Sequence, residues 1–146
     1  MRQLSLALAA CLFPTLAAAD ADAIVAAGAK LCTERDSGTF TSDGAVRNLD
    51  LTGDGRADTV VDEALFKCST AADLFAGPAG SKVHLLAEGT ESSYLVQGWD
   101  TAIWTNRQLV LLALQGTDCG AEATDPCFEV LTWGGKGFLS VRPAAQ

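Results

Sequence analysis

The sequence predicts an α+β domain that is mainly β, in which one N-terminal helix packs on an antiparallel sheet or a small sandwich or barrel held by two disulfides. Three observations support this fold. After residue 19, an alanine-rich segment with helical spacing comes first and short runs of β-branched and aromatic residues follow it. Four cysteines lie in this part of the sequence. No low-complexity linker or full internal repeat divides residues 20–146, so we expect a single globular domain.

Residues 1–19 have the composition of a secretory signal peptide. A short basic start is followed by a mainly apolar stretch over residues 4–16 and by three alanines before the cleavage position. The apolar stretch is shorter than the roughly 20 residues that cross a bilayer, and no later segment is long and apolar enough to do so. We therefore expect cleavage after Ala19 and a periplasmic or secreted protein without a membrane span. Lipidation at Cys11 is the alternative, because Leu8–Cys11 resembles the lipobox of bacterial lipoproteins.

The charge balance of the chain is acidic. The full sequence has ten lysines and arginines against eighteen aspartates and glutamates, and the segment after the leader keeps nine bases and all eighteen acids, a formal charge of −9. Such a surface repels nucleic acid and anionic lipid, so we exclude nucleic-acid binding and expect basic or cationic partners.

Four cysteines outside the leader, Cys32, Cys68, Cys119 and Cys127, predict two disulfides in an oxidising compartment. Four cysteines allow three pairings, which the sequence alone does not separate. The short segment between Cys119 and Cys127 contains glycine and proline, as expected of a loop closed by a disulfide. We therefore favour the pairing Cys119–Cys127 together with Cys32–Cys68. A metal or redox site is the rival interpretation, but CxxC spacing and clustered histidines are absent.

The helix is expected over residues 20–34. Its apolar residues recur at helical spacing, and Asp20 and Asp22 favour a helix N-terminus, although Gly28 weakens the helix in its interior. Turn signals separate the runs that follow, at Asp43-Gly44, Glu88-Gly89 and Gly134-Gly135. The expected strands are residues 39–41, 46–51, 59–65, 83–87, 94–99, 108–115, 127–133 and 138–141.

The most informative motif is LDLTGDGRADTVVD over residues 49–62, in which an aspartate occupies every fourth position from the second residue. Calcium binds six to eight oxygens, and a short loop supplies them from alternate positions and from one backbone carbonyl. The candidate ligands stand at positions 1, 3, 5, 7 and 9 of such a loop: Asp50, Thr52, Asp54, Arg56 and Asp58. The motif therefore predicts a calcium loop between two strands.

The stretch from Asp50 to Asp58 resembles the calcium loop of integrin-type FG-GAP and VCBS repeats, D-x-[DN]-G-D-G-x-x-D followed by an apolar strand, and is similar to the first half of a dockerin loop. The resemblance implies that Asp50, Asp54 and Asp58 bind Ca²⁺ through their side chains and Arg56 through its backbone oxygen. Thr52 departs from the pattern, because those families place Asp or Asn there. The ion implied is a structural one that fixes a hairpin.

A longer stretch, residues 46–86, resembles a group of small uncharacterised exported bacterial proteins. In that group a second cysteine pair would occupy the positions of Ala76 and Ser81, so this chain lacks that bridge. The group implies no activity.

A plain turn is the alternative interpretation of the aspartate motif. Asp54-Gly55 between two apolar runs is itself a hairpin signal, and aspartates at turns accept hydrogen bonds from their own backbone. A turn needs only one or two of these acids, and three acids close together repel each other without a cation. An EF-hand is excluded because Val61 occupies position 12, and the expected calcium affinity is in the weak extracellular range of about 10⁻⁴ to 10⁻³ M.

Other candidate site residues are few. His84 is the single histidine and lies in a strand-like run, and the GxSxG, HExxH, P-loop and dinucleotide fingerprints are absent. Of Trp99, Trp104 and Trp133, we expect at least two to pack in the core and any exposed one to be the first candidate for an interface.

These observations favour a non-catalytic exported binding module, with a structural calcium loop, that recognises a protein or cell-wall partner. An inhibitor of an exported lytic enzyme fits the same size, acidity and disulfides. A small hydrolase that uses His84 is the alternative from another class. It is disfavoured because active sites gather several convergent titratable groups, which the sequence does not indicate.

Overall fold

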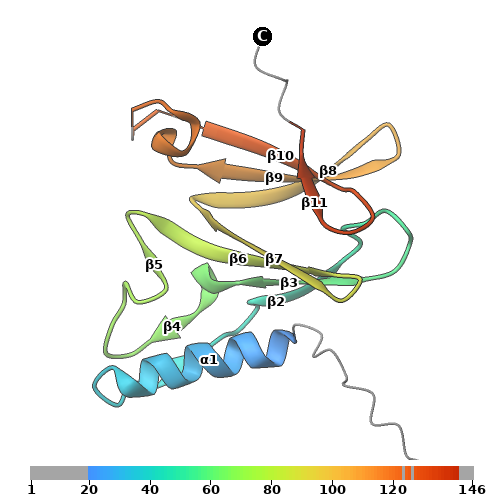
Figure 1. Cartoon of the computed structure of the whole chain (residues 1–146). Helices are drawn as coiled ribbons and strands as arrows, with labels where there is room; N and C mark the ends of the chain where they lie inside the picture. The colour runs from blue at the N-terminus through green and yellow to red at the C-terminus, as the bar shows by residue number, and fades with distance from the viewer. Residues whose placement is uncertain (1–19, 123, 126, 142–146) are drawn as a thin grey trace, which may run out of the picture.

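A computed structural model describes residues 20–122, 124–125 and 127–141. The expected signal peptide and Cys11 lie outside these residues. The described chain forms three layers, in which helix α1 (Ala21–Glu34) covers one side of a central sheet and a second sheet covers its other side (Figure 1). The predicted fold is confirmed: the chain is mainly β, with one N-terminal helix, antiparallel sheets and two disulfides.

All strand pairs are antiparallel. The central sheet has the order β2-β3-β6-β5, with β7 also paired to β6, and the second sheet has the order β11-β10-β9-β8. The central strands are β2 (Val46–Leu49), β3 (Asp58–Asp62), β5 (Ala76–Gly77), β6 (Gly80–Ala87) and β7 (Thr90–Val96). The second sheet contains β8 (Gly98–Trp104), β9 (Arg107–Leu114), β10 (Cys127–Trp133) and β11 (Phe138–Ser140). The remaining elements are the short pair β1 (Phe40–Thr41) and β4 (Lys67–Cys68) and two 3₁₀ helices, η1 (Glu63–Leu65) and η2 (Gly116–Cys119).

Helix α1 begins where the sequence predicts. Asp20 is its N-cap, and the carboxylate accepts a hydrogen bond from the amide of Asp22 at 3.0 Å. Gly28 is buried, and a Cβ atom there would lie 3.0 Å from the ring of Phe66 and 3.2 Å from that of Phe40. The glycine therefore lets the helix lie close to these rings, which offsets its low helix propensity.

The prediction of one strand over residues 94–99 is wrong. The chain leaves the central sheet after Val96 and enters the second sheet at Gly98, so two strands in different sheets replace the single one. Between them the amide of Gln97 donates to the carbonyl of Ala113 at 2.7 Å, which fixes the crossing point. This backbone bond to a distant strand cannot be read from local sequence.

The predicted strand over residues 59–65 ends early for a local reason. Its last part is the 3₁₀ helix η1, because Asp62 Oδ1 accepts a hydrogen bond from the amide of Ala64 at 3.0 Å and so caps a helical turn. The strands β4 and β5 and most of β8 are additional to the prediction. β8 joins β9 through Thr105 and Asn106, both with positive φ, at a turn that lacks the glycine signal on which the prediction depended.

Two apolar clusters hold the layers together. The cluster between the two sheets consists of Leu51, Val60, Val83, Leu85, Val96, Val110, Leu112 and Leu131. The cluster under α1 includes Phe40, Phe66 and Phe75, whose rings meet edge to face with centroids 5.1 to 5.7 Å apart. The central sheet is therefore packed on both faces, whereas within the described ranges the second sheet contributes one face to a core.

Both favoured disulfide pairings are confirmed. Cys32–Cys68 joins the last turn of α1 to β4, with Cα atoms 5.5 Å apart, and Cys119–Cys127 joins η2 to β10, with Cα atoms 6.1 Å apart. Two disulfides are typical of proteins in oxidising compartments, which agrees with the predicted export. Among the described residues, no helix has the length and apolar character needed to cross a bilayer.

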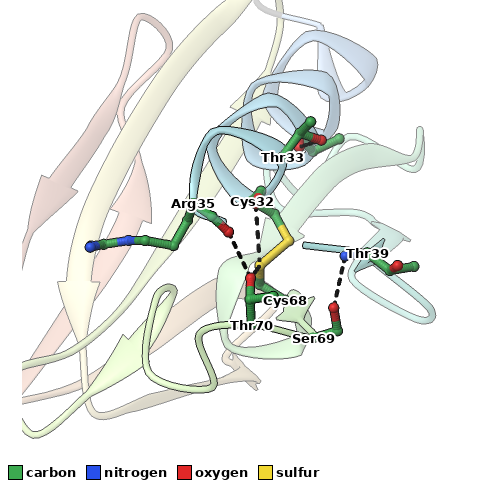
Figure 2. The surroundings of a disulfide bond; sticks show 8 residues. Cys32, Thr33, Arg35, Thr39, Cys68, Ser69 and Thr70 are labelled. Atoms are coloured by element: carbon green, nitrogen blue, oxygen red, sulfur yellow. Dashed lines mark hydrogen bonds between the residues drawn. A yellow bond between two sulfur atoms is a disulfide. The ribbon is translucent and has the colours of Figure 1, made fainter. Parts of the chain in front are cut away.

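Polar contacts surround the first disulfide, as Figure 2 shows. The hydroxyl of Thr70 donates to the carbonyl of Arg35 at 2.7 Å, just beyond the end of α1. The amide of Thr39 donates to the hydroxyl oxygen of Ser69 at 2.8 Å. These bonds tie the segments before and after the bridge to each other, so the disulfide lies within an ordered junction.

Candidate functional site

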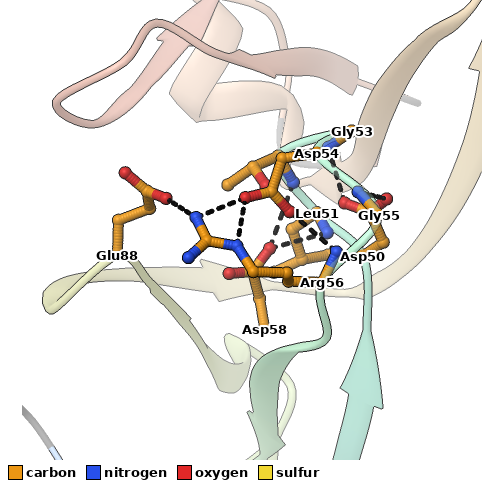
Figure 3. A network of polar contacts seen from close by, with 9 residues as sticks. Asp50, Leu51, Gly53, Asp54, Gly55, Arg56, Asp58 and Glu88 are labelled. Atoms are coloured by element: carbon orange, nitrogen blue, oxygen red, sulfur yellow. Dashed lines mark hydrogen bonds and ion pairs between the residues drawn. The ribbon is translucent and has the colours of Figure 1, made fainter.

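The predicted calcium loop connects β2 to β3 and is closed by its own amides (Figure 3). Asp50 accepts hydrogen bonds from the amides of Gly53 at 2.6 Å and Gly55 at 2.9 Å. Asp58 Oδ2 accepts one from the amide of Leu51 at 2.9 Å. Both glycines have positive φ, near +80°, which only a residue without Cβ adopts at little cost. The loop thus has the hydrogen bonding of a tight aspartate turn.

Arg56 supplies a positive charge at this loop. Its amide donates to Asp54 Oδ1 at 2.8 Å, its Nε donates to Asp54 Oδ2 at 2.7 Å, and its Nη2 pairs with both Asp54 and Glu88. The hydrogen bonds from the Arg56 amide and guanidinium lower the pKa of Asp54. The same carboxylate, with Glu88, raises the pKa of Arg56. The guanidinium therefore joins the loop to the β6–β7 turn.

The oxygen atoms of the loop are of the kind that binds calcium, but its carboxylates already accept hydrogen bonds within the protein. Thr52 Oγ1 is buried and has no hydrogen-bond partner of good geometry among the described residues, although its proximity contributes to the lowered pKa of Asp54. Within the described part of the chain, no three acidic, histidine or cysteine side chains are grouped to hold a metal ion. An ion would therefore require Asp54 to turn away from Arg56. Calcium binding at this loop stays a prediction.

A second polar cluster centres on His84, which is buried on the helix-facing side of β6 with 7% of its surface exposed. Its Nε2 lies 2.9 Å from Glu63 Oε1, and its Nδ1 lies 2.8 Å from Glu91 Oε1. Neither glutamate was predicted from the sequence as a partner of His84. The position of Glu91 was predictable from the sequence. The Glu88-Gly89 turn sets the register between β6 and β7 and so places residue 91 diagonally across from His84.

The two carboxylates favour the charged form of His84. The hydrogen bond to Glu63 is the largest cause of its raised pKa, burial opposes the shift, and the bond to Glu91 adds to it. In the imidazolium both ring nitrogens carry protons and both donate to carboxylates. Neither nitrogen then has a free lone pair with which to accept a proton from a substrate.

The three tryptophans differ in burial. Trp99 faces the core, donates from Nε1 to Asp62 at 2.9 Å and lies under the guanidinium of Arg47, whose Cζ is 4.1 Å from the ring centroid. Trp133 is half-buried, whereas Trp104 at the end of β8 has 72% of its surface exposed. Trp104 is therefore the tryptophan that the sequence analysis would assign to an interface.

Trp104 belongs to a larger apolar surface, which we call the outer face. The strand registers place its residues on the side of the second sheet that points away from the core. The outer face consists of Ala102, Trp104, Leu109, Leu111, Ala113, Phe128, Val130 and Leu139. Phe128 is 70% exposed and Leu139 is 58% exposed. In Figure 1 the second sheet lies at the top, and no described helix or strand covers the outer face.

Strand β9 is apolar on both of its faces. Val110 and Leu112 are buried in the core between the sheets, while Leu109, Leu111 and Ala113 alternate with them and belong to the outer face. Antiparallel strands with one solvated face normally alternate between apolar and polar residues, and strands covered on both faces do not. The composition of β9 is that of a strand covered on both sides, but among the described residues no other sheet or helix packs on its outer side.

Comparison with models of known protein families, with curated proteins and with solved structures finds no match to this chain. The resemblance to FG-GAP and VCBS calcium loops therefore rests on the residues of the loop alone.

Proposed function

We propose that this chain is a non-catalytic exported binding module, and that it recognises a partner protein through the outer face of the second sheet. The observation that carries the proposal is the apolar outer side of β9 next to two exposed aromatic residues, Trp104 and Phe128. Contiguous apolar surface of this kind on a monomer typically marks an interaction site. Aromatic anchors supply much of the binding energy in protein interfaces.

The chemistry of the outer face favours a protein over a glycan. Its centre is aliphatic, with Leu109, Leu111 and Val130 on adjacent strands. Sugar sites combine an aromatic platform with several polar groups that fix orientation, and here Asp100 and Arg107 are the charged residues on the same side of the sheet. A partner protein with an apolar patch of its own would bury this surface best.

The outer face can be compared in size with a typical specific interface. A standard interface buries on the order of 800 Å² on each partner. Each large aromatic residue buries roughly 150–250 Å², so Trp104 and Phe128 together supply a substantial part of that area. Leu139, which is 58% exposed, adds to this area. The acidic remainder of the chain, with a formal charge of −8 for the whole sequence, favours a basic partner.

The surroundings of His84 support the non-catalytic part of the proposal. Its two nitrogens are bonded to Glu63 and Glu91, so both ring nitrogens of the single histidine of the chain are engaged within the fold. An exported enzyme inhibitor is a specific form of the same proposal, in which the partner is a basic lytic enzyme. Identification of the partner decides between that form and a general adaptor.

Calcium is a second part of the proposal and concerns stability alone. Asp50, Asp54 and Asp58 would supply carboxylates, Thr52 its hydroxyl and Arg56 its backbone oxygen. The Thr52 hydroxyl supports this assignment, because it is buried without a hydrogen-bond partner of good geometry in the described part of the chain, and buried polar atoms normally have partners. The ion would stabilise the β2–β3 connection and would contribute no chemistry.

The function is tested by affinity capture of exported proteins on the immobilised chain, with variants of the outer face. We expect wild-type protein to retain one partner, and Phe128→Asp and Trp104→Asp to lose it. Val46→Asp is the matched control, because Val46 is 42% exposed but lies on β2 of the central sheet. Capture that survives both outer-face variants, or sedimentation of the wild-type protein with purified cell wall instead, contradicts the proposal.

A further inference from the structure

A pocket of about 630 Å³ lies between α1, the loop before β6 and the β6–β7 hairpin. This volume is within the range of about 300–1,000 Å³ that is typical of small-molecule sites. The pocket is on the opposite side of the central sheet from the second sheet, so it is separate from the outer face. Glu63 and His84 contribute to its lining.

The walls of the pocket are largely apolar. Ile24 and Leu31 come from α1, Leu74 and Phe75 from the loop between β4 and β5, and Leu95 from β7. Leu31 and Leu95 remain 46% and 51% exposed although each borders the pocket. Large aliphatic side chains that line an open cavity offer a favourable environment to an apolar ligand.

Glu63 provides an oriented charge in this apolar setting. Its Oε1 is bonded to His84 Nε2 at 2.9 Å, and Glu91 bonds the other ring nitrogen at 2.8 Å, so the imidazole is held on both sides. The side chain of Glu63 is 19% exposed, which leaves it accessible from the pocket. A carboxylate that is already held in one position loses little conformational entropy when it binds a ligand.

The charges around the pocket favour a cation. The pocket is bordered by the acids Glu63 and Asp73 and by the bases Lys82 and His84, and Glu91 adds a third acid behind the imidazole. The local balance is negative even with His84 charged, and the whole chain is acidic as well. A cationic group is therefore attracted both at long range and at the site.

We propose that this pocket binds a small organic cation with an apolar body, whose ammonium group pairs with Glu63 while its hydrocarbon part lies between α1 and Leu95. The occupant is an amphipathic amine. This site is independent of the partner surface on the second sheet, so either proposal can fail while the other holds.

The proposal is tested by calorimetric titration of the purified protein with n-octylammonium and with n-octanoate, which share an apolar chain but carry opposite charges. We expect saturable binding of the amine and affinity for the carboxylate that is at least about tenfold weaker, a difference of about 1.4 kcal/mol. Glu63→Gln should weaken amine binding and reduce this preference. Equal or tighter binding of octanoate overturns the proposal, as does the absence of saturable binding of the amine.

Two helix variants locate the binding site independently of Glu63. Ala27 lines the pocket and is exposed, so Ala27→Trp should fill the pocket and reduce amine affinity by about tenfold or more. Ala26 is also exposed but is not among the residues of the pocket, so Ala26→Trp is the control for adding an indole to α1. Equal loss of affinity in both variants, with both proteins folded by circular dichroism, shows that the amine binds elsewhere and overturns the assignment.

Discussion

Leu111 and Leu112 are neighbours on β9 but lie on opposite faces of the second sheet: Leu112 is fully buried between the two sheets, and Leu111 belongs to the outer face. One strand therefore contains two different kinds of apolar surface. The inner side stabilises the fold, and the outer side is the one that we propose binds a partner. This relationship separates variants that affect stability from variants that affect binding.

The two faces of the second sheet should respond differently to substitution. Leu112→Ala is expected to lower the free energy of unfolding by about 2–5 kcal/mol, because it leaves a cavity in the core. Phe128→Ser, at a side chain that is 70% exposed, should change it by no more than about 0.5 kcal/mol. Urea unfolding followed by circular dichroism measures both. A large loss of stability in Phe128→Ser would show that the outer face is part of the folded core.

The two disulfides should contribute unequally to stability. Cys32 and Cys68 are 36 residues apart, and Cys119 and Cys127 are 8 apart. Loop-closure entropy then predicts losses of roughly 3.8 kcal/mol and 2.5 kcal/mol when each pair is replaced by serine. Chemical unfolding of the two double variants under non-reducing conditions gives the comparison. The prediction is contradicted if removal of the shorter loop is the more damaging change.

The stability contributed by His84 should depend on pH. Because its pKa is raised in the folded state, the contribution is complete below the unfolded value of about 6.5 and is lost as the pH rises through the folded pKa. His84→Gln should therefore cost about 1.5–3 kcal/mol at pH 6 and less at pH 9. Thermal unfolding of both proteins across this range tests the trend. A cost independent of pH would exclude the charged hydrogen-bonded pair.

Calcium should stabilise the β2–β3 loop weakly. With a Kd of about 1 mM, 10 mM calcium would add about 1.4 kcal/mol to the free energy of unfolding. Asp58→Asn should abolish the effect. Arg56→Gln should enhance it, because the guanidinium that now pairs with Asp54 competes with the ion. Asp73→Asn is a control for the loss of an acid elsewhere, and an equal calcium response in wild type and Asp58→Asn would reject the site.

The sequence predicted the features that depend on local signals. The N-cap at Asp20, the turn at Glu88-Gly89 and the cysteine spacing each act over a few residues, and the structure confirms the elements that they mark. The transition from β7 to β8 was not predictable in this way. It depends on the bond between Gln97 and the distant Ala113, which only the assembled sheets provide.

The candidate sites likewise combine features that local sequence predicts with features that depend on distant residues. The aspartate loop was located from its spacing alone, but the role of Arg56 depends on Glu88, which is 32 residues away. The setting of His84 likewise depends on Glu63 from a 3₁₀ helix that was expected to be a strand. The apolar run of β9 was visible in the sequence, but only the sheet order shows that no other described sheet or helix packs on its outer side.

The most direct test of the account is methyl NMR of the chain bound to its captured partner. The partner should shift or broaden the methyl signals of Leu109, Leu111 and Val130 on the outer face. The signals of Val110 and Leu112, on the same strand but in the core, should change little. Changes confined to the β2–β3 loop or to α1, with the outer methyl groups unaffected, would contradict the assignment of the outer face as the binding surface.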